Sequence, residues 1–417
     1  MMSRISFKKN KVFIIGAGFS KGLANAPVTD EFFTKMYLKA KEERDIAKHA
    51  HKQHIESFLK LIHYLQKQTY PLMDRLQSNG KRIKRISEDP IIYPMNAEFL
   101  CTIIDLNIER AFIPRGIGVD LRGCPVPYLK GFYPHDLEEA RTFIIHNILE
   151  LFLPHKLDID WERLDKFTKR IEPEDTIITF NYDILMEQAL WRRKLWHPID
   201  GYGIGEIAEN ETLIQKPEWK TKVLVYKLHG SINWLRPGML DSEEKVSIIA
   251  GNPYNQSPFF EGLEIEGRYD ITYSETLINR HALFPTFMKT FEKRWELKLF
   301  HAAEAAIEKA DVVYFLGYSL PQADAMANLI VSKIRPDAQA VIVNPHIQDD
   351  MTDRLKQICG LKQKNLFTEE SKMEDWIDND FEFLEYQKVL NQENQIEKFI
   401  QFSEKRGTNN VRNSRDE

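Results

Sequence analysis

Five short apolar runs, each followed by a glycine or a polar residue, constrain the fold of this 417-residue chain most strongly. They are rich in β-branched and aromatic side chains and span residues 12–15, 176–180, 222–226, 311–316 and 340–343. Such runs are typical of strands buried on both faces, as in a parallel sheet. Helical patterns such as 183–193 and 323–334 lie between some of them. Strands that alternate with helices predict an α/β fold built on a parallel sheet.

A long segment with helical periodicity interrupts this pattern. Apolar residues recur at helical spacing over 55–65 and 143–152, which predicts amphipathic helices. We therefore expect a mainly helical insertion, which shapes the mouth of a pocket, buries surface against another subunit, or simply completes the core. The predicted division is a core of residues 10–38 and 170–370, an insertion of 39–169, and a final segment of 371–417 with an amphipathic helix (381–402) and a disordered polar tail.

Composition excludes several classes of function. The net charge of −5 gives no general attraction to a phosphate backbone, so we expect no direct nucleic-acid binding. The three cysteines are far apart, which excludes a zinc knuckle or a Cys-x-x-Cys redox motif and fits a reducing compartment. No secretory leader and no apolar run long enough for a membrane helix is recognisable. The expectation is a soluble, cytoplasmic protein without membrane contact.

The first predicted strand runs directly into a glycine-rich turn, Gly16-Ala17-Gly18-Phe19-Ser20. Glycines at such a turn let the backbone approach a ligand closely, and the following helix offers N–H groups to a diphosphate. The same sequence also fits a plain tight turn. A dehydrogenase is not favoured, because residues 31–50 look helical where its second strand would end in an acidic residue.

Polar residues follow the later strands, at the edge where open α/β sheets bind their ligands. Asn181 and Asp183 offer an amide and a carboxylate suited to a ribose, although they also fit a turn residue and a helix N-cap. His229 is a candidate general base beside a glycine, although most of the twelve histidines must be structural. Two further segments follow strands, Gly317 to Pro321 and Asn344-Pro345, and either also fits a simple turn.

Taken in order, these motifs resemble those of the sirtuin superfamily. The glycine turn resembles its first NAD motif, residues 179–183 its Thr-x-Asn-x-Asp motif, and 228–230 its catalytic histidine motif. The late NAD-contacting elements are matched by Gly317, Ser319, Leu320 and Asn344. The resemblance covers residues 11–35 and about 170–345. It implies a Rossmann-like parallel sheet with helices on both faces, to which the large helical insertion is added.

The sequence departs from protein deacylases at two places. Residues 231–285 contain no cysteine, so the paired Cys-x-x-Cys zinc module of the deacylases is missing. Residues 23–28 replace the deacylase Gly-Ile-Pro-Asp-Phe-Arg segment and contain no arginine. Both features resemble the zinc-free branch found in prokaryotic anti-phage defence systems, as do residues 284–289 and 318–321. That resemblance implies hydrolysis of NAD, as substrate, to nicotinamide and ADP-ribose, with no metal.

The resemblance also implies roles for the individual residues. The turn from Gly16 to Ser20 would hold the diphosphate, with Ser319 and Asn344 on the adenosine half. Asn181 would bind the nicotinamide ribose and orient water, His229 would accept a proton, and Asp183 would bond the ribose or the carboxamide. Members of the branch commonly form homo-oligomers, and some act with a hexameric translocase-type ATPase.

Three functions remain open from the sequence. The first is an NAD hydrolase that depletes NAD when activated. The second is an NAD-dependent deacylase or ADP-ribosyltransferase, which requires a groove for an acceptor. The third is a module that binds NAD or ADP-ribose without turnover. Asn181 together with His229 argues against the third, since a sensor needs no proton acceptor beside the labile bond.

Overall fold

A computed structural model describes residues 9–47, 49–78, 87–88, 91–92, 100–105, 132, 134–204, 217–235, 246–249, 251, 258–261, 280–282, 294–321, 324–347 and 349–379. The chain divides into two compact units, Met1–Met373 and Glu374–Glu417. The predicted C-terminal helix over 381–402 lies outside the described residues, and the second unit contributes the end of helix α12 (Met373–Asp378). Within the described ranges, no helix is both long and apolar enough to cross a membrane.

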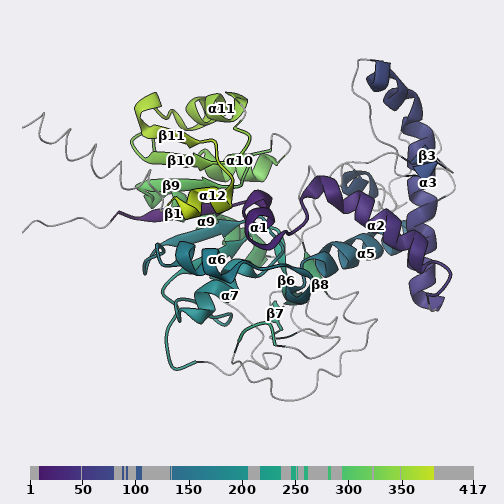
Figure 1. Ribbon diagram of the computed structural model, residues 1–417, viewed down its shortest axis with the longest axis horizontal. Coiled ribbons are helices and arrows are strands. Elements are labelled where there is room, and N and C mark those ends of the chain that lie inside the picture. The colour runs from purple at the N-terminus through teal and green to yellow at the C-terminus, as the bar shows by residue number, and fades with distance from the viewer. Residues whose placement is uncertain are drawn as a thin grey trace, which may run out of the picture. The chain divides into compact units, whose positions relative to one another are not determined.

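A six-stranded parallel sheet forms the centre of the first unit (Figure 1). Its strands are ordered β11-β10-β9-β1-β4-β5. Each neighbouring pair is parallel, as the register of Phe13 opposite Tyr314 and Ile177 illustrates. The strands are β1 (Lys11–Ile15), β4 (Thr176–Thr179), β5 (Leu224–Lys227), β9 (Val312–Leu316), β10 (Gln339–Val343) and β11 (Leu366–Glu369).

The strand order is that of the doubly wound Rossmann fold. Numbered along the chain, the six strands of the sheet stand in the order 3-2-1-4-5-6, so the direction of winding reverses between β1 and β9. Right-handed crossovers then place the connections of the two halves on opposite faces of the sheet. The fold class expected from the sequence is therefore confirmed, and the reversal point lies beside the glycine turn.

Two sets of helices cover the two faces of this sheet (Figure 1). One set packs α6 against both α1 and α7, and the other packs α10 against both α9 and α11. Phe167 of α6 meets Phe13 and Phe19 edge-on, which builds an aromatic core under the first set. The helices are α1 (Ala17–Ala24), α6 (Trp161–Thr168), α7 (Leu185–Arg192), α9 (Arg294–Lys309), α10 (Ala325–Val331) and α11 (Asp349–Cys359).

The insertion is mainly helical in its described part. It holds α2 (Thr29–Glu43), α3 (His49–Ser78) and α5 (Pro134–Leu151), with α3 packed along α5, and a short hairpin of β2 (Ser87–Glu88) and β3 (Ile91–Ile92). The apolar positions predicted over 55–65 and 143–152 are buried, apart from the half-buried Leu151. Helix α2 runs across the predicted boundary at residue 38, and α6 packs with the sheet helices although it was placed in the insertion.

Shorter elements complete the described part of the chain. An antiparallel sheet of order β7-β6-β8 follows β5, with β6 starting at the residue after His229. Its strands are β6 (Gly230–Leu235), β7 (Ser247–Ile248) and β8 (Arg280–Ala282), and two 3₁₀ turns are η2 (Pro154–Lys156) and η3 (Gln363–Asn365).

Candidate active site

A pocket of about 520 Å³ opens at the carboxyl edge of the sheet, where the winding reverses between β1 and β9. The turns after β1, β4, β5, β9 and β10 all contribute to it, together with α2 and the end of α5. The pocket is lined by Gly16, Ala17, Gly18, Ser20, Pro27, Val28, Phe32, Phe152, Phe180, Asn181, Tyr182, Asp183, His229, Gly317, Tyr318, Ser319, Pro321, Asp324, Asn344 and His346.

The glycine turn after β1 packs directly on the turn after β9. The N–H of Gly18 donates to the carbonyl of Gly317 at 2.9 Å, and the N–H of Phe19 donates to the carbonyl of Gly16 at 3.1 Å. A Cβ on Gly16 would lie 2.6 Å from the Gly317 carbonyl oxygen, so the glycines are required by this backbone contact. The N–H groups of Gly18 and Phe19 are therefore already hydrogen-bonded within the protein. Fewer backbone N–H groups are available to a diphosphate than the sequence suggested.

Asn181 fastens the end of β4 to this turn. Its side-chain nitrogen donates to the carbonyl of Gly16 and to the hydroxyl of Ser20, both at 2.9 Å. The carbonyl can only accept, which fixes the orientation of the amide. This leaves Oδ1, an acceptor, as the amide atom outside these two bonds. The Thr179 hydroxyl supports the arrangement, because it accepts from the backbone N–H of Asn181 at 3.1 Å.

His229 stands at the end of β5 with an acidic partner. Its Nε2 lies 3.2 Å from Oδ2 of Asp324, and both side chains are largely buried. The imidazole packs edge-on against Phe180 at a centroid distance of 5.0 Å, and Phe180 stacks on Tyr318 at 4.8 Å. A carboxylate and aromatic walls thus fix the ring that the sequence marked as the candidate base.

The two carboxylate oxygens of Asp183 differ in their hydrogen bonding. Its Oδ1 accepts from the N–H of Leu185 at 3.0 Å, so the expectation that it caps the following helix is close to the observed geometry, although α7 starts at Leu185 with Ile184 as its N-cap. Its Oδ2 is buried and has no hydrogen-bond partner among the described residues. Buried carboxylate oxygens are nearly always bonded, so this atom is suited to accept from a ligand in the pocket.

A buried ion pair contacts the backbone of Asp183. The Lys227 ammonium lies 2.9 Å from Glu187 and also donates to the backbone carbonyl of Asp183. Burial holds the pKa of the Glu187 carboxyl above its usual value, and the Lys227 ammonium beside it offsets only part of that rise. The hydroxyl of Tyr202 extends this network, reaching Glu187 at 3.3 Å and Asn233 at 3.2 Å. Because the network holds the carbonyl of Asp183, it fixes the backbone that carries the unbonded carboxylate oxygen.

The structure brings ten of the twelve predicted site residues to this one pocket. Ser319 lines it as an exposed side chain, and Asn344 lines it while its Oδ1 accepts from the N–H of His346 at 3.0 Å. Phe19 and Leu320 do not line it, because both side chains are fully buried. Leu320 also has a left-handed φ of 49°. Its backbone rather than its side chain therefore shapes this turn.

Several residues of the pocket are not predicted from the sequence. Asp324 precedes a helix, and nothing in its own segment points to His229. Phe152 comes from the insertion, where it packs edge-on against Phe32 and contacts the Tyr182 ring. Its apolar spacing predicted only a core position. The insertion thus forms part of the pocket wall, in line with the first of the three roles considered for it.

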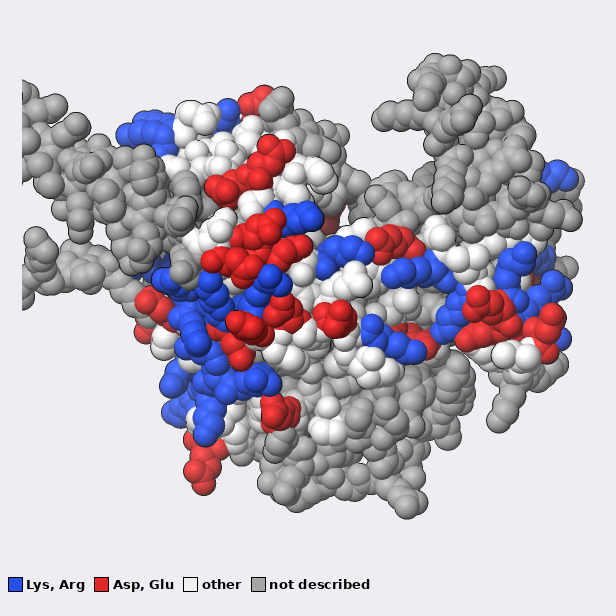
Figure 2. All heavy atoms as spheres, in the orientation of Figure 1, with Lys and Arg blue, Asp and Glu red and all other residues white. Residues whose placement is uncertain are grey.

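A second cleft and an acidic cluster lie elsewhere in the described part of the chain. A cleft of about 610 Å³ is lined by Lys169, Trp191, Arg192, Arg193, Lys194 and others, and Figure 2 shows Lys and Arg side chains gathered near α6 and α7. It lies at the amino ends of the strands and contains none of the predicted site residues.

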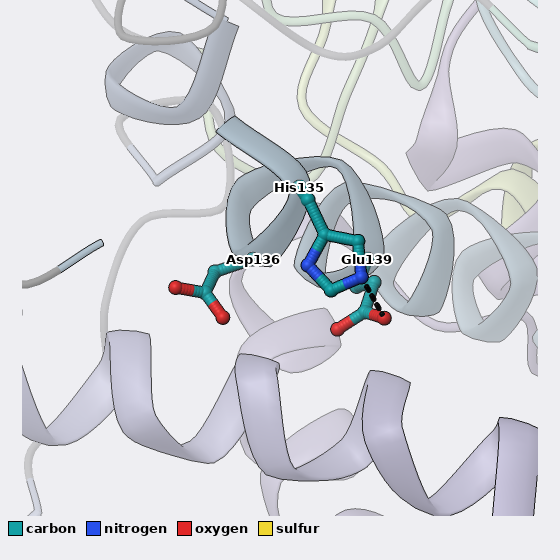
Figure 3. Close-up of side chains that lie close together, drawn as sticks. All are labelled: His135, Asp136 and Glu139. Carbon is teal, nitrogen blue, oxygen red and sulfur yellow. Dashed lines mark ion pairs between the residues drawn. The ribbon is translucent and has the colours of Figure 1, made fainter. Parts of the chain in front are cut away.

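In Figure 3, His135 and Glu139 point toward each other while Asp136 turns away. Asp136 pairs with Lys60, and Glu139 accepts from Ser57, so these acids already serve to fasten α5 to α3.

The sheet order and the pocket at its reversal point define a Rossmann-like α/β protein with a ligand-sized pocket at the carboxyl ends of its strands. The family model of the SIR2-like domain matches residues 175–347. The matched segment includes Asn181, His229 and Asp324 but not the glycine turn.

Other comparisons add little to this assignment. No curated protein matches the sequence. A mutant Sir2 homologue in complex with ADP-ribose is similar at 12% identity and a TM-score of 0.30, over 59% of this chain and 75% of that one. A Sir2 complex with a p53 peptide and NAD+ is similar at 13% identity and a TM-score of 0.27, over 60% and 77%. The fold assignment therefore rests on the strand order.

Proposed function

We propose that this protein hydrolyses NAD+ to nicotinamide and ADP-ribose in the pocket at the carboxyl edge of its sheet. The observation that carries the proposal is the convergence of Asn181, His229 and the glycine turn on one pocket of about 520 Å³. The match of residues 175–347 to the SIR2-like domain supports NAD as the ligand. Cavities of this size are typical of cofactor and small-molecule sites.

The charges and donors of the pocket fit cleavage of the nicotinamide–ribose bond. Positive charge builds on the anomeric carbon as the bond breaks, and an acceptor-rich wall stabilises that charge. Oδ1 of Asn181 accepts from a ribose hydroxyl or from the attacking water. His229 takes the proton that water loses, so NAD+ and water give nicotinamide, ADP-ribose and a proton. Oδ2 of Asp183, which has no partner in the described part of the chain, accepts from the carboxamide or the ribose.

The diphosphate would contact the start of helix α1 and the Ser20 hydroxyl. That hydroxyl oxygen accepts from Asn181, so its own proton is left to donate to a phosphate oxygen. The eight-residue helix α1 begins at Ala17 and presents the positive end of its dipole to the same part of the pocket. The helix start and the Ser20 hydroxyl thus take the place of the backbone N–H groups of the whole glycine turn, which the sequence led us to expect around the diphosphate.

Incubation of the full chain with NAD+, followed by chromatography of the products, tests the proposal. We expect nicotinamide and free ADP-ribose in equal amounts without any added acceptor. His229→Ala and Asn181→Ala should each lower the rate by about 100-fold or more. His155→Ala, at an exposed position on η2, is the matched control and should hydrolyse NAD+ at the parent rate.

Two outcomes would contradict the proposal. Parent-like NAD+ loss in both site variants would show that these residues do not carry the reaction. Release of nicotinamide only when an acyl-lysine or another acceptor is present would instead identify a deacylase or an ADP-ribosyltransferase. The defence role, the homo-oligomer and the ATPase partner rest on the family resemblance alone and stay predictions.

A further inference from the structure

A second acid beside the candidate base is the feature that the proposed mechanism does not yet use. Oδ2 of Asp324 lies 3.2 Å from Nε2 of His229, and the exposed fractions of the two side chains are 8% and 12%. The two residues come from different parts of the sheet, because His229 follows the edge strand β5 and Asp324 lies between β9 and α10. The fold alone therefore brings them together at the pocket wall.

The scaffold around Asp324 fixes its carboxylate independently of His229. Its Oδ1 caps α10 by accepting from the N–H of Ala327 at 3.0 Å, which leaves Oδ2 for the imidazole. The Asp324 N–H donates to the carbonyl of Pro321 at 3.2 Å. The side chain of Asn328 closes the same turn, donating to the carbonyls of Pro321 at 3.1 Å and Asp324 at 2.8 Å. The carboxylate is thus held in place by the turn that carries it.

This geometry determines which nitrogen of His229 acts as the base. An ionised carboxylate only accepts hydrogen bonds, so Nε2 must carry a proton toward Asp324. The neutral imidazole then has its lone pair on Nδ1. When Nδ1 takes a proton from water, the ring becomes positively charged beside the negative carboxylate, which stabilises the product of that step.

We infer that Asp324 is the positioning residue of His229, selecting the tautomer whose Nδ1 accepts the proton and stabilising the imidazolium that results. The inference rests on the proposed function for the step it serves, but the pairing itself does not depend on turnover. Asp324 touches the imidazole and not the reacting atoms in this scheme, so it acts through His229.

The pH dependence follows from the charges that face the imidazole. NAD+ loss requires a neutral ring, so the rate rises as pH passes through the pKa of His229. The Asp324 carboxylate favours the charged ring, so replacing it with a neutral amide moves this rise to lower pH. The other titratable groups that line the pocket are Asp183, Tyr182, Tyr318 and His346, and they are the same in the parent and the variant. Lys227 lies two residues before His229 in the chain and is paired with Glu187.

Asp324→Asn is the decisive variant because asparagine keeps the shape and is also a good N-cap. We expect the kcat for NAD+ loss to fall by about 10-fold to 1,000-fold, with KM changed less than about threefold. The acidic limb of the kcat profile should move to lower pH. Asp324→Glu, which keeps the charge, should recover part of the lost rate.

Asp160→Asn is the matched control. Asp160 caps α6 in the same way, with Oδ1 accepting from the N–H of Arg163 at 3.1 Å and Oδ2 paired with the Arg163 guanidinium at 2.6 Å. It does not line the pocket. This variant should keep the parent kcat and the parent pH profile, which separates loss of a cap carboxylate from loss of the partner of His229.

Nitrogen NMR of the imidazole rings, with His229 identified from the spectrum of His229→Gln, tests the pairing without turnover. We expect the Nε2–H tautomer in the parent and a lower midpoint of titration in Asp324→Asn. An identical tautomer and midpoint in both proteins would overturn the inference, even if the parent hydrolyses NAD+. If the parent does not consume NAD+ while the ring responds as expected, the pairing is supported and the proposed function fails.

Discussion

At the scale of single residues, Asn181 divides its amide between the fold and the pocket. The nitrogen makes both structural bonds, to Gly16 and Ser20, while the oxygen is the atom suited to a ligand. Asp183 divides its carboxylate in the same manner, with one oxygen accepting from Leu185 and the other without a hydrogen-bond partner among the described residues. Such residues cannot be replaced without affecting both stability and chemistry, so variants must be chosen to separate the two effects.

Asn181→Asp should destabilise the fold strongly at neutral pH. A carboxylate oxygen would replace the nitrogen that lies 2.9 Å from the Gly16 carbonyl, so two acceptors would face each other. We expect a loss of about 2–3 kcal/mol in urea unfolding at pH 7. The unfavourable contact raises the pKa of the new carboxyl in the folded state. The loss should therefore shrink as pH falls and the group takes up a proton.

Asn365→Asp is the control for this prediction. Asn365 also donates its side-chain nitrogen to a carbonyl, that of Pro336 at 3.2 Å, but this hydrogen bond is exposed to solvent. Solvent can hydrate the new carboxylate there, so the free energy of unfolding should change by less than about 0.5 kcal/mol. Equal losses in the two variants would show that the contact with Gly16 is not the cause.

The sequence predicted which residues line the pocket better than it predicted which residues pair with them. Asn181, Asp183 and His229 could be predicted because each follows an apolar strand at the edge where parallel sheets bind ligands. Asp324 could not, because its partner lies across the sheet and its own segment only predicts a helix start. The turn from Gly16 to Ser20 was assigned to a diphosphate as a whole, because the Gly317 carbonyl that accepts from the Gly18 N–H cannot be seen in the sequence.

At the scale of secondary-structure elements, ion pairs fasten α5 to the helices beside it. Glu150 near the end of α5 pairs with Lys39 of α2, and it lies 3.4 Å from Nε2 of His146 one turn earlier. These bonds, that of His146 first, hold the pKa of the Glu150 carboxyl well below its usual range despite its burial. Glu150 lies two residues before Phe152, which lines the pocket. It therefore helps to place the aromatic wall.

Glu150→Gln should lower stability most at neutral pH and less in acid. A carboxyl whose pKa is depressed on folding adds stability above its unfolded pKa of about 4.3 and loses it as pH falls through the folded value. The expected loss in urea unfolding is about 1 kcal/mol at pH 7, and it should diminish toward pH 3. Glu138→Gln, at an exposed position on the same helix, should change stability much less. A loss for Glu150→Gln that does not depend on pH would contradict the assignment.

The predicted elements succeeded where their pattern was local. The five apolar runs are strands and the periodic stretches of the insertion are helices. Strand β11 was not predicted, because Leu366 to Glu369 is a short run with only partial burial and a charged end. Helix α6 was assigned to the insertion since nothing in its sequence shows that it packs against α1 and α7.

At the scale of the whole molecule, the order of the strands is what creates a site. The sequence predicted parallel strands but not which strands are neighbours, because each run would fit any central position. Only the pairing of β1 with β9 brings the glycine turn beside Gly317 and leaves a pocket at that point. Long-range order of this kind depends on the packing of all helices at once, and no single segment encodes it.

Ligand binding at this junction should stabilise the first unit as a whole. ADP-ribose, which is not hydrolysed at the bond in question, should raise Tm in a concentration-dependent way, by the equivalent of about 2.7 kcal/mol at 100 times its Kd. His229→Ala should respond similarly, since it keeps the rest of the pocket. Constant Tm up to millimolar ADP-ribose in both proteins would argue against a dinucleotide site.

The contact between the two glycine turns has a genetic consequence. A Cβ at Gly317 would lie 2.2 Å from the backbone nitrogen of Phe19 and 2.5 Å from the carbonyl carbon of Gly18. Those are atoms that every residue type carries, so no replacement at 18 or 19 can make room. A selection for suppressors of Gly317→Ala should therefore return revertants rather than compensating changes at those two positions.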